Sequence, residues 1–214
     1  VGHSHSDDQW FAQRILHDAI FHAQHHRKGP VHINFPFREP FYPEDDLPSA
    51  VSHPHSVQHH NSVNVPHPDV VEALAKTIDR ASTLWVIVGM GSSPLSPGSV
   101  EGFCEQTGAI CLADPLSNLH LSHQVDHFDT WLDDSIEKPD LVISVGHHFL
   151  SKKLKQFLRK NKPLEHIHIQ PHIDFEDPFQ SISQLVTCQP ELFFEALDGQ
   201  LLKKDPSSSV KKLK

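Results

Sequence analysis

The stretch LWVIVGMGSS, residues Leu84 to Ser93, decides the fold class of this chain. An unbroken apolar run, Leu84 to Val88, is followed by Gly89 and Gly91. Such a run is typical of a strand that is buried on both faces of a sheet. Glycines permit the tight turn that leads from a strand of this kind to the next helix. The stretch therefore indicates a parallel sheet that is covered by helices.

The same rhythm continues along the chain. Further strands are predicted at Ala109–Leu112, Leu141–Val145, His166–Gln170 and Gln184–Thr187. Helices are predicted from Pro68 to about Ala81 and around Ser99–Glu105, Phe128–Asp133, Ser151–Lys160 and Pro190–Leu197. Alternation of strands and helices with short connections favours right-handed crossovers and a parallel sheet. We therefore predict an α/β fold, a Rossmann-like three-layer domain with a mostly parallel sheet over residues 67–198.

The stretch GPVHINFPFREPFYP, Gly29 to Pro43, predicts a domain boundary. Val31–Phe35 suits a buried strand, and the prolines that follow stop any regular element. Before it, Asp7–His26 has the apolar periodicity of a helix. A helix and one strand cannot bury themselves, so we expect residues 1–43 to be the C-terminal remnant of a preceding domain. Segments 44–66 and 199–214 are predicted linkers.

Composition restricts the class of protein. The net charge of −9 argues against nucleic-acid binding, and no apolar run is long enough to span a bilayer. No secretory signal pattern occurs, so we expect a cytoplasmic protein with its three cysteines as free thiols. The 20 histidines are scattered through loops without cysteine partners, so no metal site is predicted. The chain begins at Val1 without methionine, and we expect a piece of a longer polypeptide.

Two stretches at predicted strand ends are candidate ligand sites. Gly89 and Gly91 resemble the start of a dinucleotide-binding turn, but the third glycine of that motif is absent. This favours a tight turn without a ligand. Asp114 and Ser117 follow the second strand, where ligands gather in open sheets. Their residue types favour hydrogen bonds to turn amides instead.

The segment GHHFLSKKLKQFLRK, Gly146 to Lys160, carries the strongest candidate site. Ser151 is placed to cap the helix that follows. Lys152 and Lys153 fall in its first turn, where positive charge is unfavourable because the helix dipole is positive there. An anionic ligand bound by these ammonium groups and the free N–H groups would explain them. A solvated basic face explains them equally well, and both interpretations stay open.

Four stretches together resemble the 2-succinyl-5-enolpyruvyl-6-hydroxy-3-cyclohexene-1-carboxylate synthase family, the thiamine-diphosphate enzymes of menaquinone biosynthesis. They are GPVHINFPFREPFYP, LWVIVG, AICLADPLSNL and PDLVISVGHHFLSKKLKQFL, in the family's order. The resemblance implies that the chain holds the last helix and strand of a pyrimidine-binding domain and the whole central domain. It implies a transferase that decarboxylates 2-oxoglutarate and adds the succinyl-semialdehyde unit to isochorismate.

The resemblance also implies site residues, cofactors and partners. Lys152 matches a lysine that contacts the isochorismate carboxylate, Lys153 stands where the family usually has arginine, and Ser151 is a secondary candidate. Thiamine diphosphate and Mg²⁺ belong to the parent enzyme, a homo-oligomer, and no catalytic, cofactor-binding or metal residue is assigned here. The chain alone is therefore expected to be inactive. A free-standing Rossmann-like module for a nucleotide or anionic metabolite, or a purely structural domain, remain alternatives.

Overall fold

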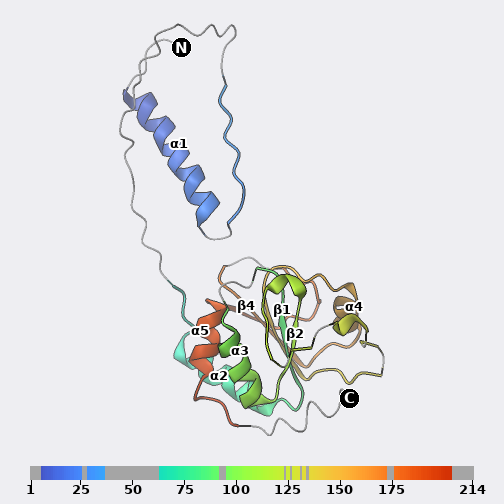
Figure 1. The fold of residues 1–214 in the computed structure, drawn as a ribbon. Coiled ribbons are helices and arrows are strands. Elements are labelled where there is room, and N and C mark those ends of the chain that lie inside the picture. Colours follow the sequence, from blue (N-terminus) through green and yellow to red (C-terminus); the bar gives the residue numbers. More distant parts are fainter. Residues whose placement is uncertain are drawn as a thin grey trace. The chain divides into compact units, whose positions relative to one another are not determined.

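The computed structural model describes residues 6–25, 28–36, 63–91, 95–122, 124–125, 127–130, 132–133, 135–172 and 176–203. The chain divides into two compact units, Val1–Ser62 and Val63–Lys214, which we describe separately (Figure 1). Most of the two predicted linkers, over 44–62 and 204–214, lies outside the described residues.

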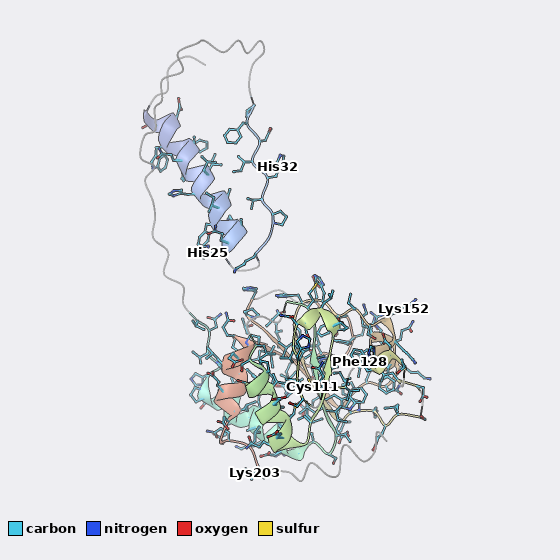
Figure 2. The ribbon with its side chains drawn as sticks, viewed as in Figure 1. His25, His32, Cys111, Phe128, Lys152 and Lys203 are labelled. Atoms are coloured by element: carbon cyan, nitrogen blue, oxygen red, sulfur yellow. The ribbon has the colours of Figure 1, made fainter. Side chains whose placement is uncertain are left out.

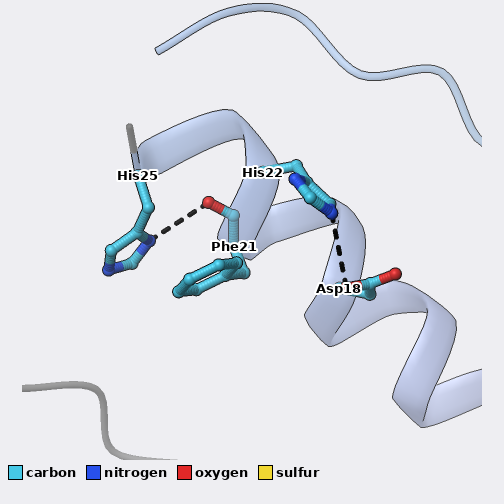
Figure 3. A network of polar contacts seen from close by, with 4 residues as sticks. All are labelled: Asp18, Phe21, His22 and His25. Carbon is cyan, nitrogen blue, oxygen red and sulfur yellow. Dashed lines mark hydrogen bonds and ion pairs between the residues drawn. The ribbon is translucent and has the colours of Figure 1, made fainter. Parts of the chain in front are cut away.

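The first unit contains helix α1, Ser6–Gln24, close to its predicted position. Asp7 and Asp8 lie in the first turn, where negative charge is favourable. Near the other end, Nδ1 of His25 donates a hydrogen bond to the Phe21 carbonyl at 3.1 Å (Figure 3). His22 lies 3.6 Å from the carboxylate of Asp18 one turn earlier. Both contacts therefore join residues one turn apart at this end of α1.

The structure does not contain the strand predicted at Val31–Phe35. Residues 28–36 have no regular secondary structure, and Val31 and Phe35 are 44% and 55% exposed. A strand is defined by backbone hydrogen bonds to a neighbouring strand. In the described part of this unit, only α1 and this segment are present, so no partner strand is available. The apolar pattern therefore indicates that this segment prefers the strand conformation, but it does not show whether a second strand is present to pair with it.

The second unit is built on five parallel strands in the order β2-β1-β3-β4-β5. The strands are β1 Leu84–Val88, β2 Ile110–Ala113, β3 Leu141–Val145, β4 Glu165–Gln170 and β5 Gln184–Thr187. The positions predicted from the apolar runs are confirmed, with boundary changes of one residue at β2 and β4. The all-parallel pairing confirms the predicted α/β class.

Helices cover both faces of this sheet, which confirms the three-layer prediction (Figure 1). The helices are α2 Pro68–Arg80, α3 Pro97–Thr107, α4 Lys152–Lys160 and α5 Pro190–Leu197. One face packs against α2, α3 and α5 through a core that includes Ile78, Phe103 and Phe193. The other face packs against α4, where the rings of Trp85 and Phe157 stack with centroids 5.6 Å apart.

The helix predicted around Phe128–Asp133 is only a single 3₁₀ turn, η2, Phe128–Thr130. Phe128 is buried in the core on the α4 side, which anchors the turn. Beyond it, the carboxylate of Asp133 accepts hydrogen bonds from the Ser135 amide and hydroxyl, at 2.8 and 2.6 Å. Short polar side chains compete with helical backbone hydrogen bonds in this way. The helix therefore does not continue beyond one turn.

Candidate functional site

The strand order reverses direction between β1 and β3, and ligands of open α/β sheets bind at such a point. Here the described residues that follow the two strands are hydrogen-bonded to each other. The Gly89 amide donates to Val145, and the Met90 amide donates to His148, both at 2.8 Å. A Cβ added at Gly89 would lie 2.5 Å from the His148 carbonyl oxygen. The glycine is therefore explained by close packing of two loops, as the absence of the third glycine indicated.

Gly146 repeats this arrangement from the other side. Its φ of +110° lies in a region that favours glycine. A Cβ there would meet the Gly89 carbonyl oxygen at 2.8 Å. The two loops therefore approach each other through glycine on both sides. The predicted tight turn without a ligand accounts for the sequence pattern, and the interpretation as a nucleotide site loses its support.

Asp114 is a buried carboxylate at the end of β2. One oxygen accepts the Leu116 amide at 3.2 Å, and the Ser117 hydroxyl accepts the Leu119 amide at 3.2 Å. The predicted role of both residues in turns is thus confirmed. The second Asp114 oxygen accepts the Leu150 amide at 2.7 Å, a contact across 36 positions that the sequence did not predict. It ties the end of β2 to the loop that enters α4.

Ser151 is the N-cap of α4, as predicted, and its hydroxyl oxygen accepts the Leu154 amide at 2.9 Å. The same hydroxyl donates its proton to the carboxylate of Asp129, which lies in η2. Ser151 is buried although Lys152 and Lys153 beside it are exposed. A buried hydroxyl that both donates and accepts is fully satisfied. Ser151 therefore fixes how the helix begins.

The two lysines of the first turn differ in their contacts. The Lys153 ammonium donates to the backbone carbonyl of Asp129 at 2.7 Å. The positive charge of Lys153 also contributes to lowering the pKa of Asp133, after the larger effect of hydrogen bonds from Ser135. Lys152 lies at the start of α4 on the surface (Figure 2), and its ammonium makes no hydrogen bond or ion pair with the described residues. Lys153 is thus hydrogen-bonded to the chain itself, whereas Lys152 has no such partner among the described residues.

A buried polar network on the α4 side of the sheet was missed by the sequence reasoning. The Ser144 hydroxyl lies 2.8 Å from ring nitrogens of both His166 and His168, and His166 also contacts Ser181 at 2.8 Å. Burial, and secondarily the charge of His168, lowers the pKa of His166 to about 3. Burial also lowers the pKa of His168. Both imidazoles are therefore neutral at neutral pH. The alternation of His166, His168 and Gln170 with isoleucines was the signal that could have revealed this polar stripe.

The cysteines are free thiols, as predicted. Cys111 and Cys188 are buried, whereas Cys104 is only partly buried. The pKa of Cys111 is raised by a hydrogen bond with Cys104 and by burial, and burial raises the pKa of Cys188 to about 11. A raised pKa disfavours the reactive thiolate. Cys111 and Cys188 therefore serve as packing residues of the core.

No group of three His, Cys, Asp or Glu side chains in the described part of the chain is arranged to hold a metal ion. The glycine turn after β1, which could have approached a phosphate, is closed by the chain itself. None of the helices that the structure describes is long and apolar enough to cross a membrane.

Comparison with known proteins places this fold in a class. Residues 79–204, more than half of the chain, match the protein-family model described as "Middle domain of thiamine pyrophosphate". The chain therefore belongs to the family of middle domains of thiamine-pyrophosphate enzymes. The crystal structure of benzoylformate decarboxylase from Polynucleobacter necessarius shares the fold, with a TM-score of 0.53 and 15% identity. The match covers 94% of this chain and 37% of that one.

Within this class, the chain is similar to 2-succinyl-5-enolpyruvyl-6-hydroxy-3-cyclohexene-1-carboxylate synthases. It is 32% identical over 194 residues to the synthase of Cytophaga hutchinsonii, covering 87% of this chain and 34% of that protein. It is 29% identical over 210 residues to the synthase of Bacillus cytotoxicus, covering 92% of this chain and 36% of that protein. The chain therefore spans about a third of the length of these curated relatives.

Proposed function

We propose that this chain is the central part of a thiamine-diphosphate-dependent transferase of menaquinone biosynthesis. The complete enzyme would decarboxylate 2-oxoglutarate and add the succinyl-semialdehyde unit to isochorismate. The observation that carries the proposal is the similarity to synthases named for this product, at 32% and 29% identity over nearly all of the chain. The family of the central domain supports thiamine diphosphate as the cofactor of the complete protein.

The proposed organisation follows from the boundary at Gly29–Pro43. Residues 1–43 would complete a pyrimidine-binding domain, 44–66 and 199–214 would be linkers, and 67–198 would be the central domain. The exposed apolar side chains of α1 support this, because Trp10, Phe11 and Ile20 are each more than half exposed in this chain. Large apolar groups gain free energy when a neighbour covers them. We propose that the rest of the first domain provides that cover in a cytoplasmic homo-oligomer.

Lys152 is the residue through which this chain would contact a substrate. Its ammonium stands at the N-terminal end of α4, where the helix dipole adds to its positive potential. Isochorismate and 2-oxoglutarate are carboxylates, which form charge-assisted hydrogen bonds with ammonium groups. Lys153 and Ser151 are already engaged with Asp129, and they would hold the turn that presents Lys152.

Thiamine diphosphate with Mg²⁺, when bound by the complete enzyme, would supply the carbanion chemistry, and the protein would supply substrate binding and orientation. The described residues of this chain offer no metal ligand set, so the cofactor contacts would come from the other domains. The contribution of this chain would then be the binding of an anionic substrate. On this basis we expect the isolated chain to be inactive.

The test is Lys152→Gln in the complete synthase, with KM measured separately for isochorismate and 2-oxoglutarate. Loss of a charged hydrogen bond to the isochorismate carboxylate should raise KM for isochorismate by roughly 10-fold or more, with little change for 2-oxoglutarate. Lys160→Gln is the matched control, because Lys160 is an exposed lysine in the last turn of the same helix. Equal effects of Lys152→Gln on the two substrates would contradict the proposed role.

A further inference from the structure

Asp129 contacts two of the three candidate site residues at the start of α4. Its carboxylate accepts the proton of the Ser151 hydroxyl, and its backbone carbonyl accepts the Lys153 ammonium at 2.7 Å. Asp129 itself is exposed and lies in η2, 22 positions before Ser151. One residue from a separate element therefore binds both neighbours of Lys152 in the sequence.

The turn that carries Asp129 is also held in place by contacts other than those with Ser151 and Lys153. Phe128 is buried in the core shared with α4, only 5% exposed (Figure 2). The amide and the hydroxyl of Thr130 both donate to the His127 carbonyl at 2.9 Å. His127 adopts a φ of 55°, which turns the chain sharply just before η2. The carboxylate thus stands on a short, anchored turn and not on a loose loop.

The contact with Ser151 determines how that hydroxyl can act. A serine hydroxyl has one proton to donate and two lone pairs to accept. Donation of its proton to Asp129 fixes the orientation of this hydroxyl, while its oxygen accepts the Leu154 amide at 2.9 Å. The Asp129 carboxylate also brings negative charge to the N-cap of α4, at the positive end of the helix dipole. Asp129 therefore favours the arrangement in which a helix begins with Lys152.

The contact with Asp129 makes Lys153 different from Lys152. Lys153 is drawn toward η2 by the carbonyl of Asp129. Lys152 has no hydrogen-bonding or ion-pair partner among the residues that the structure describes. A lysine needs only one good acceptor for this tethering, so the fork geometry of arginine is not required at position 153.

We propose that Asp129 is a positioning residue for the anion site at the start of α4. It binds Ser151 and Lys153, so that Lys152 alone is presented to the substrate carboxylate. The inference rests on the proposed function, because it concerns the substrate that Lys152 binds. It assigns Asp129 no contact with substrate or cofactor.

The test uses Asp129→Ala, Asp129→Asn, Ser151→Ala and the double variant Asp129→Ala/Ser151→Ala in the complete synthase. Asp129→Ala should raise KM for isochorismate by about 3- to 10-fold and leave KM for 2-oxoglutarate unchanged, as expected for loss of a coupled pair. Asp129→Asn keeps an oxygen that can accept from Ser151, so its effect should be smaller. Because both single variants break the same contact, the double variant should resemble the more affected of them.

The matched control is Asp133→Asn. Asp133 is an exposed aspartate in the same segment, and its hydrogen bonds go to Ser135 instead of α4. If general negative charge near Lys153 were sufficient, this variant would reproduce the effect of Asp129→Ala, and the proposal would be wrong. We expect a change below about twofold, as for an exposed charge.

The outcomes separate this inference from the proposed function. If Lys152→Gln selectively raises KM for isochorismate but the Asp129 and Ser151 variants leave it unchanged, the positioning role is overturned and the proposed function stands. If Lys152→Gln has no selective effect, the proposed role of Lys152 is contradicted, and with it the anion site that Asp129 would position. If Asp129→Ala does not fold, Asp129→Asn and Ser151→Ala decide, since wild-type KM values for both would overturn the positioning role.

Discussion

Replacing Gly89 by alanine should destabilise this protein, whereas the same replacement at Gly102 should stabilise it. At Gly89 the new Cβ would lie 2.5 Å from the His148 carbonyl oxygen and 2.7 Å from the Phe149 ring. Backbone atoms cannot move aside cheaply, and overpacking of this kind costs about 1–3 kcal/mol. At Gly102, inside α3, nothing lies within 4 Å of the new Cβ. There the gain is about 0.5–1 kcal/mol, because alanine restricts the unfolded chain and favours the helix.

The free energy of unfolding of both variants can be measured by urea denaturation of this chain, with circular dichroism as the signal. The two variants add the same methyl group, so opposite signs would isolate the close approach of the loops after β1 and β3. Unchanged m-values are required, so that midpoint shifts report native-state stability. If Gly89→Ala were as stable as wild type or more so, the loops would not pack as described. The structural explanation of the glycine turn would then be wrong.

Three further predictions concern the buried imidazole of His166, the carboxylate of Glu191 and the turn after β1. The pKa of His166 falls from 6.5 to about 3 on folding. The neutral imidazole should therefore contribute its whole free energy of stabilisation above pH 6.5, and this contribution should be lost as the pH falls toward 3. The loss should be on the order of 4 kcal/mol near pH 3. Between pH 7 and pH 4, the urea midpoint of His166→Gln should therefore fall less steeply than that of the wild type. Glu191 accepts the Ser96 amide at 2.6 Å and the Ser99 hydroxyl at 2.5 Å, so Glu191→Ala should cost about 1–2 kcal/mol; Glu195→Ala, on an exposed position of the same helix, should change the urea midpoint little. Calorimetry of this chain with ATP, FAD and NAD should show no tight binding, because the turn after β1 is closed by Met90 and His148, and a micromolar dissociation constant would contradict that explanation.

The inner strands β1 and β3 were predictable because they are buried on both faces of the sheet. Leu84–Val88 is a continuous apolar run, Leu141–Val145 is apolar except for Ser144, and both strands are fully buried in the structure. The segment Val31–Phe35 shows the limit of predicting strands from local sequence. It has the composition of a strand but no neighbouring strand in the described part of its unit. Strand preference is a local property, whereas strand pairing depends on another segment.

The candidate site was predictable in part. Ser151 and the first-turn lysines were identified because a cap and misplaced positive charge are visible within one helical turn. Asp129 was not identified, since it lies in a segment predicted as an ordinary helix that forms only a 3₁₀ turn. The second contact of Asp114, with the Leu150 amide, was likewise out of reach. Both depend on loops that meet at the carboxyl edge of the sheet.

The amino-acid sequence by itself determined the α/β class, the place of each buried strand and the helix that begins after Ser151. These follow from apolar periodicity, turn residues and capping, which act over a few neighbouring positions. Only the tertiary structure decided that Gly89 faces the His148 carbonyl, that His166 and His168 share the Ser144 hydroxyl, and that Asp129 binds Ser151 and Lys153. Each of these contacts joins segments that are far apart in the chain, and their geometry is set by how the strands and helices pack. For that reason the sequence indicated which residues could bind an anion, whereas the packing separated Lys152 from Lys153.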